Sequence, residues 1–326
     1  MSKLASIFDK WESTTALIIG DSMIDAYFYG KSTRNSPEAP VPIINLSKKE
    51  RRLGGAANVA LNIKALGATP ILCSIVGHDR NGSQLKSLLD QEGLSTQGII
   101  EDESRCTTVK TRVIGNNQHF LRIDEEETNL INTDVENQLF TTISSLIRTA
   151  DVLIFQDYNK GVLSPSLIKN VTQLCNNSNV PIVVDPKHNQ FFDYQNCTLF
   201  KPNRKEIVEA YQLKEEDNHN MQSLAQQLRA DLNAKNVMTT LSEDGVIIIN
   251  DQGYHHLLAH PRKILDVSGA GDSVLSVAAL CVALKLPNPL IAGLANLAGG
   301  LVCEKIGVVP IDKGQLLDEA TRLEMG

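Results

Sequence analysis

Short apolar runs alternate with segments of helical periodicity along most of the chain. The first run, at residues 17–19, ends at Gly20-Asp21, as a buried parallel strand ends at a binding edge. Further strands are predicted at 71–76, 152–156, 181–184, 237–241 and 246–250, and helices at 56–66, 81–92, 133–149, 164–178, 204–213, 220–233, 271–285, 289–305 and 313–323. This alternation predicts an α/β fold, with a central, mainly parallel sheet sandwiched by helices.

Two segments break the alternation. Residues 27–46 contain Tyr27-Phe28-Tyr29, a proline-rich stretch and an extended run, and residues 98–124 consist mainly of extended segments. We expect the two to form a small β-sheet lid over the site, as insertions in a single domain spanning 1–326. Because exposed sheet edges need covering, two lids are expected to pair in a homodimer.

The composition is that of a soluble globular protein, with 42% hydrophobic and 21% charged residues. A net charge of −7 argues against nucleic acid as a partner. The N-terminus lacks a signal-peptide core, and the most apolar run, 274–284, is too short to span a bilayer. We therefore expect no membrane contact and a cytoplasmic location. Six cysteines without CxxC spacing favour reduced thiols over disulfides or a zinc site.

The segment DVSGAGD at 266–272 carries the clearest chemistry. Gly269 and Gly271 bracket Ala270, and apolar residues then recur with helical spacing, so a helix begins here with free backbone N–H groups. Such a start attracts anions, and glycine lets a phosphate approach closely. Asp272, in the first turn, is expected to be stabilised as its anion and to act as a base. An anion hole beside a base suits phosphoryl transfer to a hydroxyl. A capped helix with a glycine-rich start is the structural alternative.

Polar residues also follow several predicted strands. Asp157, Asp185 and Asn203 each follow a strand-like run directly, and ligands of such folds bind beyond the carboxyl ends of the strands. We expect these side chains to meet at one edge of the sheet. The other polar candidates lie near the N-terminus, where turn chemistry, capping and helix packing are the alternatives: Asp21, Asp25, Gly54, Gly55 and Asn58.

Four motifs together resemble the ribokinase-like (PfkB) family of carbohydrate kinases. They are GGAANVALNIKALGA at 54–68, Asn203-x-x-Glu206, Thr240-x-Ser242-x-x-Gly245 and DVSGAGD. They occur in family order and, with the elements between them, cover nearly the whole chain. Within the family the chain is most similar to the D-glycero-β-D-manno-heptose-7-phosphate kinases, which also form the N-terminal half of bifunctional ADP-heptose synthases. The closer resemblance is carried by GDSMIDAYFYG, SPEAPVP, FLRID, DYNKG at 157–161, DPK at 185–187 and ANLAGGLVCEKIG.

The resemblance implies an ATP- and Mg²⁺-dependent kinase that converts heptose 7-phosphate to the 1,7-bisphosphate in ADP-heptose synthesis for lipopolysaccharide. It implies that Asp272 takes the proton of the sugar hydroxyl and that the backbone of Gly269, Ala270 and Gly271 forms the anion hole. The residues implied at the ATP phosphates and the hydrated Mg²⁺ are Asn203, Arg204, Lys205 and Glu206, and those bordering the nucleotide are Thr240, Ser242 and Gly245.

The substrate side follows from the same resemblance. The positions that match sugar-hydroxyl contacts of the family are Asp25, Gly54, Gly55 and Asn58, to which we add Asp21. The candidates for holding the substrate phosphate are Lys160, Lys187, Arg112 and Arg122, although exposed cations of this kind are usually just solvated.

Two further expectations concern a cation and a partner. Family members often bind a monovalent cation between the aspartate matched by Asp266 and a late loop. Here that loop, at 305–311, has no hydroxyl residue after its glycine, so activation by potassium stays open. Because the chain ends at Gly326, we expect no nucleotidyltransferase half and a separate nucleotidyltransferase in the pathway.

Three other functions compete with the heptose kinase. A GDS-type serine hydrolase would use Ser22 with an Asp185-x-x-His188 pair, but it would leave the anion hole of DVSGAGD without a role. A non-catalytic sugar- or nucleotide-binding protein is disfavoured by the presence of Asp272 and both glycines. A kinase for another phosphosugar or a nucleoside is the nearest alternative.

Overall fold

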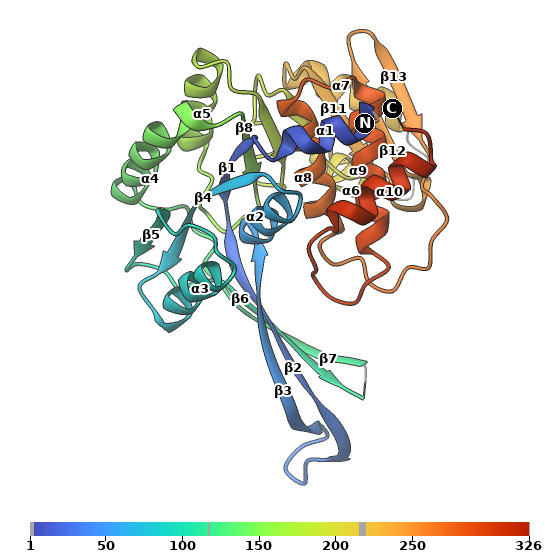
Figure 1. Ribbon diagram of the computed structural model, residues 1–326. Coiled ribbons are helices and arrows are strands. Elements are labelled where there is room, and N and C mark those ends of the chain that lie inside the picture. The colour runs from blue at the N-terminus through green and yellow to red at the C-terminus, as the bar shows by residue number, and fades with distance from the viewer. Residues whose placement is uncertain (1–2, 117, 215–219, 326) are drawn as a thin grey trace.

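The computed structural model describes residues 3–116, 118–214 and 220–325, and within them nine strands form one large sheet. These strands are Thr15–Gly20 (β1), Thr69–Gly77 (β4), Gly98–Asp102 (β5), Val152–Gln156 (β8), Ile182–Asp185 (β9), Leu199–Phe200 (β10), Asn236–Thr240 (β11), Val246–Asn250 (β12) and Gly253–Leu257 (β13). Their order is β13-β12-β11-β10-β9-β8-β1-β4-β5 (Figure 1). The strands from β11 to β5 are parallel, and β12 and β13 extend one edge antiparallel.

Helices cover both faces of this sheet because its strands carry apolar side chains on both sides. In β1, Ile18 packs in one core, whereas Leu17 and Ile19 pack in the other. Helices over the first core are Lys3–Trp11 (α1), Ala56–Ala65 (α2), Arg80–Gln91 (α3), Ala270–Ala283 (α8), Asn288–Val302 (α9) and Lys313–Arg322 (α10). Those over the second core are Thr133–Leu146 (α4), Pro165–Asn177 (α5), Arg204–Ala210 (α6) and Met221–Asp231 (α7). Two short 3₁₀ helices lie at Ile147–Thr149 (η1) and Ser242–Asp244 (η2).

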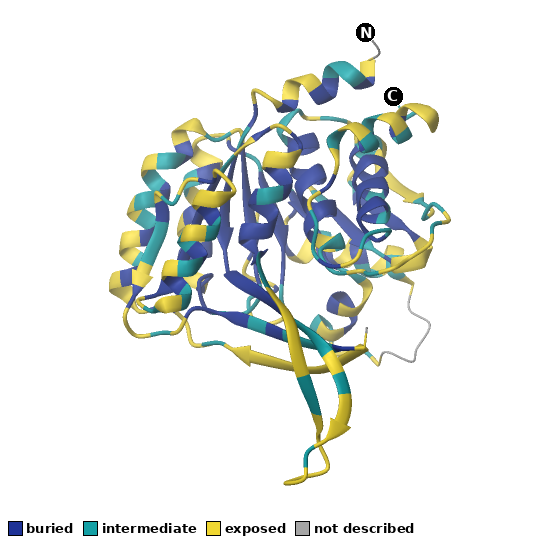
Figure 2. Ribbon diagram, turned by 60° about the horizontal axis from the view of Figure 1, so that its bottom comes forward, coloured by how far each residue is buried: buried dark blue, intermediate teal, exposed yellow. Residues whose placement is uncertain are grey.

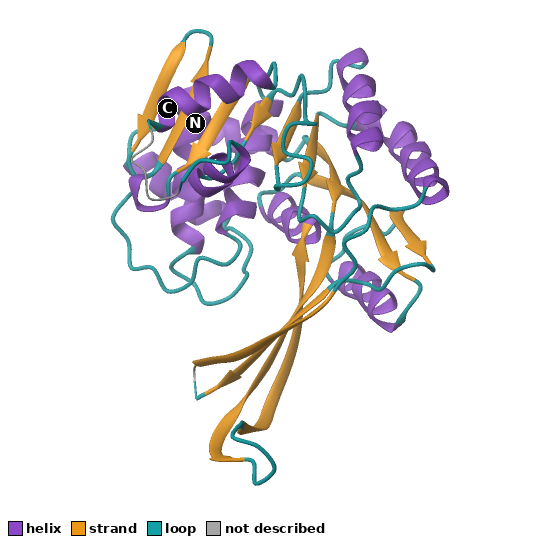
Figure 3. Ribbon diagram, turned by 180° about the vertical axis from the view of Figure 1, so that it is seen from behind, coloured by secondary structure: helices purple, strands orange, loops and turns teal. Residues whose placement is uncertain are grey.

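A second sheet projects from this body (Figures 1 and 3). Its strands in the described part of the chain are Ser22–Asn35 (β2), Pro42–Gly55 (β3), Val109–Gly115 (β6) and Gln118–Glu125 (β7), in the order β3-β2-β6-β7. We call this four-stranded sheet the small sheet. Its base is anchored in the core by Ile24, Leu53 and Val109, whereas β7 is exposed along its length (Figure 2). Since β2 follows β1 directly, the small sheet stands at the carboxyl edge of the large one.

The predicted α/β fold with a small β-sheet is confirmed, and the strands predicted at 152–156 and 246–250 coincide with β8 and β12. The lid segment 98–124 is only partly as predicted, because β5 pairs with β4 in the large sheet. The chain leaves that sheet through a loop that Asp79 and Thr107 tie down, and only then enters the small sheet. Elements without a predicted counterpart are α1, β10 and β13.

The helices and the cysteines bear on the expectations about membranes and disulfides. None of the helices in the described residues has both the length and the apolar character needed to cross a bilayer. All six cysteines are unpaired, and all except Cys106 are buried.

Candidate active site

Helix α8 begins at Ala270 without a side-chain cap. The preceding residue, Gly269, has φ 80°, a left-handed conformation that glycine adopts without strain. A Cβ atom on Gly269 would also lie 3.3 Å from Val308 Cγ1, a tight contact, and 3.4 Å from Asn58 Nδ2, an ordinary one. The uncapped helix start expected from the sequence is therefore present.

The backbone of the first turn is open to a ligand at Gly271. The nearest atom to a Cβ placed on that residue would be Asp185 Oδ2, 4.0 Å away. The expected anion hole differs in one respect, because the N–H of Ala270 donates to the carbonyl of Val267 at 3.2 Å. The turn that leads into the helix thus already uses one of the three amides assigned to anion binding.

Asp272 lies in this first turn and is 5% exposed. The amide Nδ2 of Asn58 donates to its Oδ2 at 2.6 Å, and the hydroxyl of Tyr158 donates to its Oδ1 at 2.9 Å. Gln156 Nε2 is 3.4 Å from the same Oδ1. Both carboxylate oxygens are therefore held by side chains from other elements.

Burial raises the pKa of Asp272 to about 6, helped by the negative charge of Asp185 and opposed by the hydrogen bonds from Asn58 and Tyr158. This direction is opposite to the one expected from the helix N-terminus, because desolvation outweighs the helix dipole. A carboxyl with this pKa is still mostly ionised at neutral pH. It is also a stronger base than an ordinary aspartate.

Helix α2 brings Asn58 to Asp272. Its first turn follows the pair Gly54-Gly55, and Asn58 is buried there. One turn later Asn62 Nδ2 donates to the carbonyl of Asn58, while Asn62 Oδ1 accepts from the Ser273 hydroxyl and the Ile311 N–H, both at 3.0 Å. These bonds fix the N-terminal turn of α2 against that of α8.

The two glycines before α2 permit a close approach to β2. A Cβ on Gly54 would lie 2.3 Å from Asp25 Oδ2, and one on Gly55, where φ is 60°, would lie 2.3 Å from the Asp21 carbonyl. Asp25 is buried and forms an ion pair with Arg112 of β6. The structure therefore brings together the sugar-side candidates Asp25, Gly54, Gly55 and Asn58.

Arg112 and Arg122 lie opposite each other on β6 and β7 but differ in environment. The Arg112 guanidinium faces the site through Asp25 and lies 5.3 Å from the centre of the Tyr27 ring. Arg122 pairs with Asp124 at 3.0 Å, and its side chain is 59% exposed. Of the two, Arg112 is the one placed at the sugar side.

The carboxylate of Asp21, an expected sugar contact, is bound to the backbone of a neighbouring loop. Its carboxylate accepts the backbone N–H groups of Tyr158, Lys160 and Val162 at 2.8, 3.0 and 3.1 Å, and the residue is 1% exposed. Burial raises the pKa of Asp21, and these amide donors oppose the shift. Through these three hydrogen bonds Asp21 holds the loop 157–162 that follows β8.

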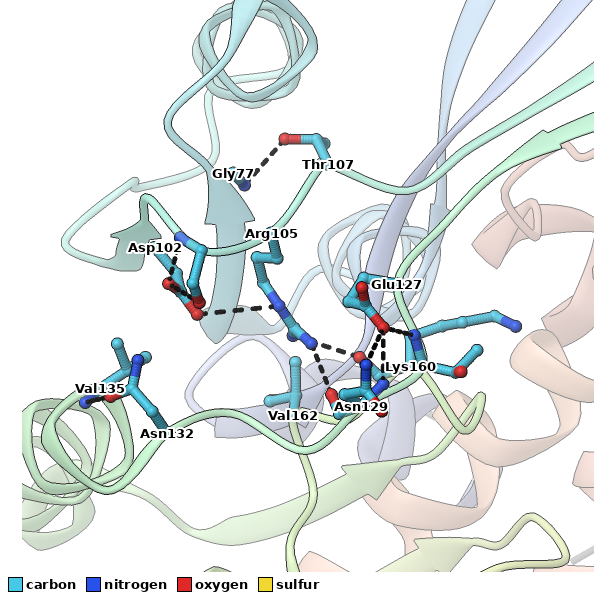
Figure 4. Close-up of polar contacts among 12 residues, drawn as sticks. Gly77, Asp102, Arg105, Thr107, Glu127, Asn129, Asn132, Val135, Lys160 and Val162 are labelled. Carbon is cyan, nitrogen blue, oxygen red and sulfur yellow. Dashed lines mark hydrogen bonds and ion pairs between the residues drawn. The ribbon is translucent and has the colours of Figure 1, made fainter.

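Arg105 holds the same loop through the carbonyl of Lys160 (Figure 4). Its guanidinium donates to the carbonyl of Lys160 at 3.2 Å and to that of Asn129 at 2.7 Å, and its Nε lies 3.8 Å from Asp102 Oδ2. The loop that carries Tyr158 is thus fixed both by the carboxylate of Asp21 and by the guanidinium of Arg105.

The two lysine candidates lie on different sides of the site. Lys160 Nζ donates to Glu126 at 2.8 Å, next to the small sheet. Lys187 forms an ion pair with Glu206 at the start of α6. Burial alone would lower the pKa of Lys187, but the charges of Asp185 and Glu206 raise it.

The nucleotide-side candidates meet at neighbouring strand ends. Asn203 caps α6 through a reciprocal box, in which Asn203 Oδ1 accepts the Glu206 N–H at 2.9 Å and Glu206 Oε2 accepts the Asn203 N–H at 2.8 Å. Asn203 also bridges to Thr240, and the turn after β11 contains Ser242 and Gly245, both with positive φ. Arg204 and Lys205 are exposed and pair with Asp244 and Glu209.

The buried carboxylates on this side, Asp185 and Glu206, are each paired with a lysine, Lys201 and Lys187. In the described part of the chain, no group of three or more His, Cys, Asp or Glu side chains is placed to hold a metal ion. This donor set fits Mg²⁺ that is held mainly by nucleotide phosphates and water, with one carboxylate near it.

Asp266, the expected cation ligand, is occupied by the backbone. Its two oxygens accept the N–H groups of Ser268 at 2.9 Å and Gly307 at 2.8 Å. Burial would raise the pKa of Asp266, but these donors hold it below its usual value. The late loop is therefore joined to the DVSGAGD segment through this carboxylate.

The serine hydrolase alternative is wrong. Ser22 Oγ is buried and has no hydrogen-bond partner among the described residues, so no histidine activates it. Asp185 is paired with Lys201 instead, and His188 is exposed.

The sequence analysis did not select Tyr158, Gln156, Arg105 or Lys201 as site residues. Tyr158 lies in DYNKG, a motif of the closer resemblance from which the sequence analysis selects Asp157 and Lys160 but not the tyrosine. Its position two residues after the predicted strand 152–156 is the signal that could have singled it out.

Comparison with known proteins gives the family. The chain matches the pfkB family of carbohydrate kinases over residues 13–313. Proteins named Bifunctional protein HldE from Geotalea uraniireducens and Helicobacter pylori are each 36% identical to it, over 97% and 89% of its length. The chain covers 65% and 63% of those two proteins, slightly under two thirds of their length.

Solved structures share the fold. The phosphofructokinase-2 from Escherichia coli in complex with potassium has a TM-score of 0.80 at 18% identity, covering 95% of this chain and 99% of that one. The same enzyme in complex with fructose-6-phosphate has a TM-score of 0.76 at 19% identity, with the same coverage. The family match spans the strand ends and helix starts described above, from β1 to the beginning of α10. This chain belongs to the pfkB family and is a carbohydrate kinase.

Proposed function

We propose that this protein transfers the γ-phosphoryl group of ATP to the anomeric hydroxyl of D-glycero-β-D-manno-heptose 7-phosphate. The product is the 1,7-bisphosphate, an intermediate of ADP-heptose biosynthesis. One observation carries the proposal: Asn58, from a motif of the whole family, and Tyr158, from the motif that resembles heptose kinases, both bind Asp272. The similarity to the proteins named HldE supports the same assignment.

Asp272 acts as the base of this reaction. The anomeric oxygen attacks the γ-phosphorus, the bond from that phosphorus to the β–γ bridging oxygen breaks, and ADP leaves. The hydroxyl proton passes to a carboxylate oxygen of Asp272. Asn58 Oδ1 is buried and without a hydrogen-bond partner in the described residues, so it can accept from a sugar hydroxyl beside the base. The first turn of α8 stabilises the charge on the moving group.

The sugar binds between the small sheet and α2. Asp25 and the backbone of Gly54 and Gly55 face its hydroxyls. Arg112 and Lys160 lie at the same end and supply positive charge for the 7-phosphate, while Lys187, paired with Glu206, faces the transferring phosphoryl group. Arg122 is more exposed and is assigned a secondary role.

The nucleotide binds along the segment 203–206 and the turn 240–245. Glu206 would help to hold Mg²⁺ through its hydration shell, and the ion would neutralise charge on the phosphates. Asp266 and the loop that contains Gly307 are where a monovalent cation would act, since the carboxylate already joins these segments. Whether potassium activates the enzyme is measured directly by omitting it from the assay.

We also propose a homodimer through the small sheet and a cytoplasmic location. Leu121 and Ile123 on the edge strand β7 are 57% and 47% exposed, which favours a covering partner. Unpaired cysteines and the use of ATP accord with the cytoplasm. The proposal concerns the kinase step, and a separate nucleotidyltransferase would act later in the route to ADP-heptose, after the 7-phosphate has been removed.

A panel of sugars in an ATP-coupled assay tests the proposal. We expect turnover of D-glycero-β-D-manno-heptose 7-phosphate, little of its α-anomer or of fructose 6-phosphate, and none of unphosphorylated heptose. Phosphorus NMR should detect a phosphate on the anomeric carbon. Preferential turnover of another phosphosugar or of a nucleoside would replace the substrate assignment, and ligand binding without ATP consumption would refute the kinase.

A further inference from the structure

We infer that Tyr158 is a positioning residue for Asp272, and that the loop 157–162 is built to hold its hydroxyl in place. The inference rests on the proposed role of Asp272 as the base. A carboxylate can rotate about its terminal torsion, so a single donor leaves its plane free. Here Tyr158 binds Oδ1 and Asn58 binds Oδ2, which fixes the plane from both sides.

The loop that carries Tyr158 is restrained at the backbone N–H of every second residue from 158 to 162. Asp21 accepts the N–H groups of Tyr158, Lys160 and Val162, and Arg105 binds the Lys160 carbonyl. The charged side chains of Asp21 and Arg105 therefore both bind the backbone of this six-residue loop. Such restraint is expected where a side chain must be placed accurately, and the side chain in question is Tyr158.

The ring of Tyr158 is restrained as well. Lys187 Nζ lies 5.8 Å from the ring centre, and Lys187 is itself paired with Glu206. The Tyr158 hydroxyl therefore contacts Asp272, while its ring contacts Lys187, which lies among the nucleotide-side residues. Its hydrogen bond also stabilises the ionised carboxylate and opposes the rise in pKa that burial causes.

The first test is Tyr158→Phe in the full chain, which removes the hydroxyl and keeps the ring. We expect kcat to fall by about tenfold or more, and the acidic limb of its pH profile to move up by about one unit, because a hydrogen bond to a charged group is lost. The KM for ATP should change little.

Two matched variants separate this role from general effects. Tyr211→Phe removes a hydroxyl that bonds Asp231 at 2.5 Å, away from the site, and should leave kcat and the pH profile unchanged. Tyr194→Phe removes a hydroxyl that bonds Asp157 at 2.8 Å in the same loop. It should lower stability without moving the acidic limb.

A measurement without substrate makes the inference independent of the sugar. In protein labelled with ¹³C at aspartate carboxyls, the signal lost in Asp272→Asn reports the titration of Asp272. We expect its midpoint to rise in Tyr158→Phe and to fall when 3-fluorotyrosine, a stronger donor of the same shape, replaces Tyr158. If Tyr158→Phe does not fold, the shift of the Asp272 midpoint in the fluorinated protein tests the inference by itself.

The outcomes are distinct. An unchanged midpoint in the folded variants, or an unchanged pH profile in Tyr158→Phe, overturns the inference. If the wild type does not phosphorylate heptose 7-phosphate but the midpoint shifts as expected, the proposed substrate is wrong and the positioning role stands.

Discussion

Asn58 in α2 donates a 2.6 Å hydrogen bond to Oδ2 of Asp272 in α8, across 214 positions of the chain. The bond joins the first turns of two helices, each preceded by glycine. One helix start lies beside the sugar-side residues and the other offers its backbone to a phosphate. The amide of Asn58 is thus the direct structural link between the two halves of the proposed reaction.

Asp272→Asn tests the base itself. The substitution keeps the size of the side chain but removes proton acceptance, so kcat should fall by about 10²- to 10⁴-fold. The KM for ATP should change little, because the nucleotide-side residues are untouched. Steady-state kinetics measure both values, and circular dichroism verifies the fold. Near-normal turnover at neutral pH would make Asp272 a structural residue of the helix start.

The pH dependence of kcat follows from the raised pKa of Asp272. The base works only when ionised, and its pKa of about 6 places the loss of activity on the acidic side. We expect kcat at saturating substrates to fall about tenfold per pH unit well below that pKa, and to level off above it. Activity that stays level down to about pH 5 would contradict the assignment. A buffer series at constant ionic strength provides the measurement.

The raised pKa of Asp272 affects stability in the opposite direction, because acidic pH lowers activity but raises the free energy of unfolding. The carboxyl has a higher pKa in the folded protein than the ordinary value of 3.8, so the folded state binds more protons in between. Asp272 therefore contributes more to the free energy of unfolding as pH falls from about 7 towards 4. Asp157, whose pKa burial also raises to about 6, contributes in the same direction.

Gly54→Ala tests the sugar side. The new methyl group would lie 2.3 Å from Asp25 Oδ2, and the ion pair with Arg112 keeps Asp25 from moving away. Overpacking of this kind costs about 1–3 kcal/mol, and here the strain falls on a proposed substrate contact. We expect the KM for the sugar phosphate to rise by about tenfold, a change worth about 1.4 kcal/mol, with the KM for ATP unchanged.

Gly293→Ala is the matched control for that variant. In α9 the added methyl group would meet its nearest neighbour, Leu257 Cδ2, at 3.4 Å, an ordinary contact. Because alanine favours a helix interior over glycine, stability should not fall and kinetics should not change. An equal rise of KM for sugar and ATP in Gly54→Ala would point to general misfolding instead of a sugar-side effect.

Local signals predicted much of the fold but only part of the site. Asn203 was selected because it follows a strand-like run and matches the Asn-x-x-Glu motif of the family, and in the structure Asn203 and Glu206 form a capping box at the start of α6. The edge strand β13 was missed because GYHHL is mostly polar and exposed. Its pairing with β12 is set by its neighbour instead of by its own hydrophobic pattern.

The roles of Asp21 and Tyr158 depend on contacts between distant segments. A carboxylate after a strand predicts a ligand or a turn equally well, and only the path of the loop 157–162 decides that Asp21 binds its amides. Tyr158 reaches a residue 114 positions away. No periodic pattern in the sequence indicates a contact between residues so far apart, so only the folded structure reveals it.

The last prediction concerns the exposed edge of the small sheet. Leu121 and Ile123 lie on one face of β7, and they are exposed in a strand whose outer backbone groups lack a neighbouring strand in the described chain. If two copies cover these edges in solution, Leu121→Lys together with Ile123→Lys places like charges in the interface and should separate the copies. Light scattering after size exclusion should give about twice 35.7 kDa for the wild type and a single chain mass for the variant. Leu323→Lys, an exposed apolar-to-lysine change in the last turn after α10, is the control and should remain a dimer. A wild type that stays monomeric at micromolar concentration would mean that the apolar residues of β7 serve another purpose than self-association.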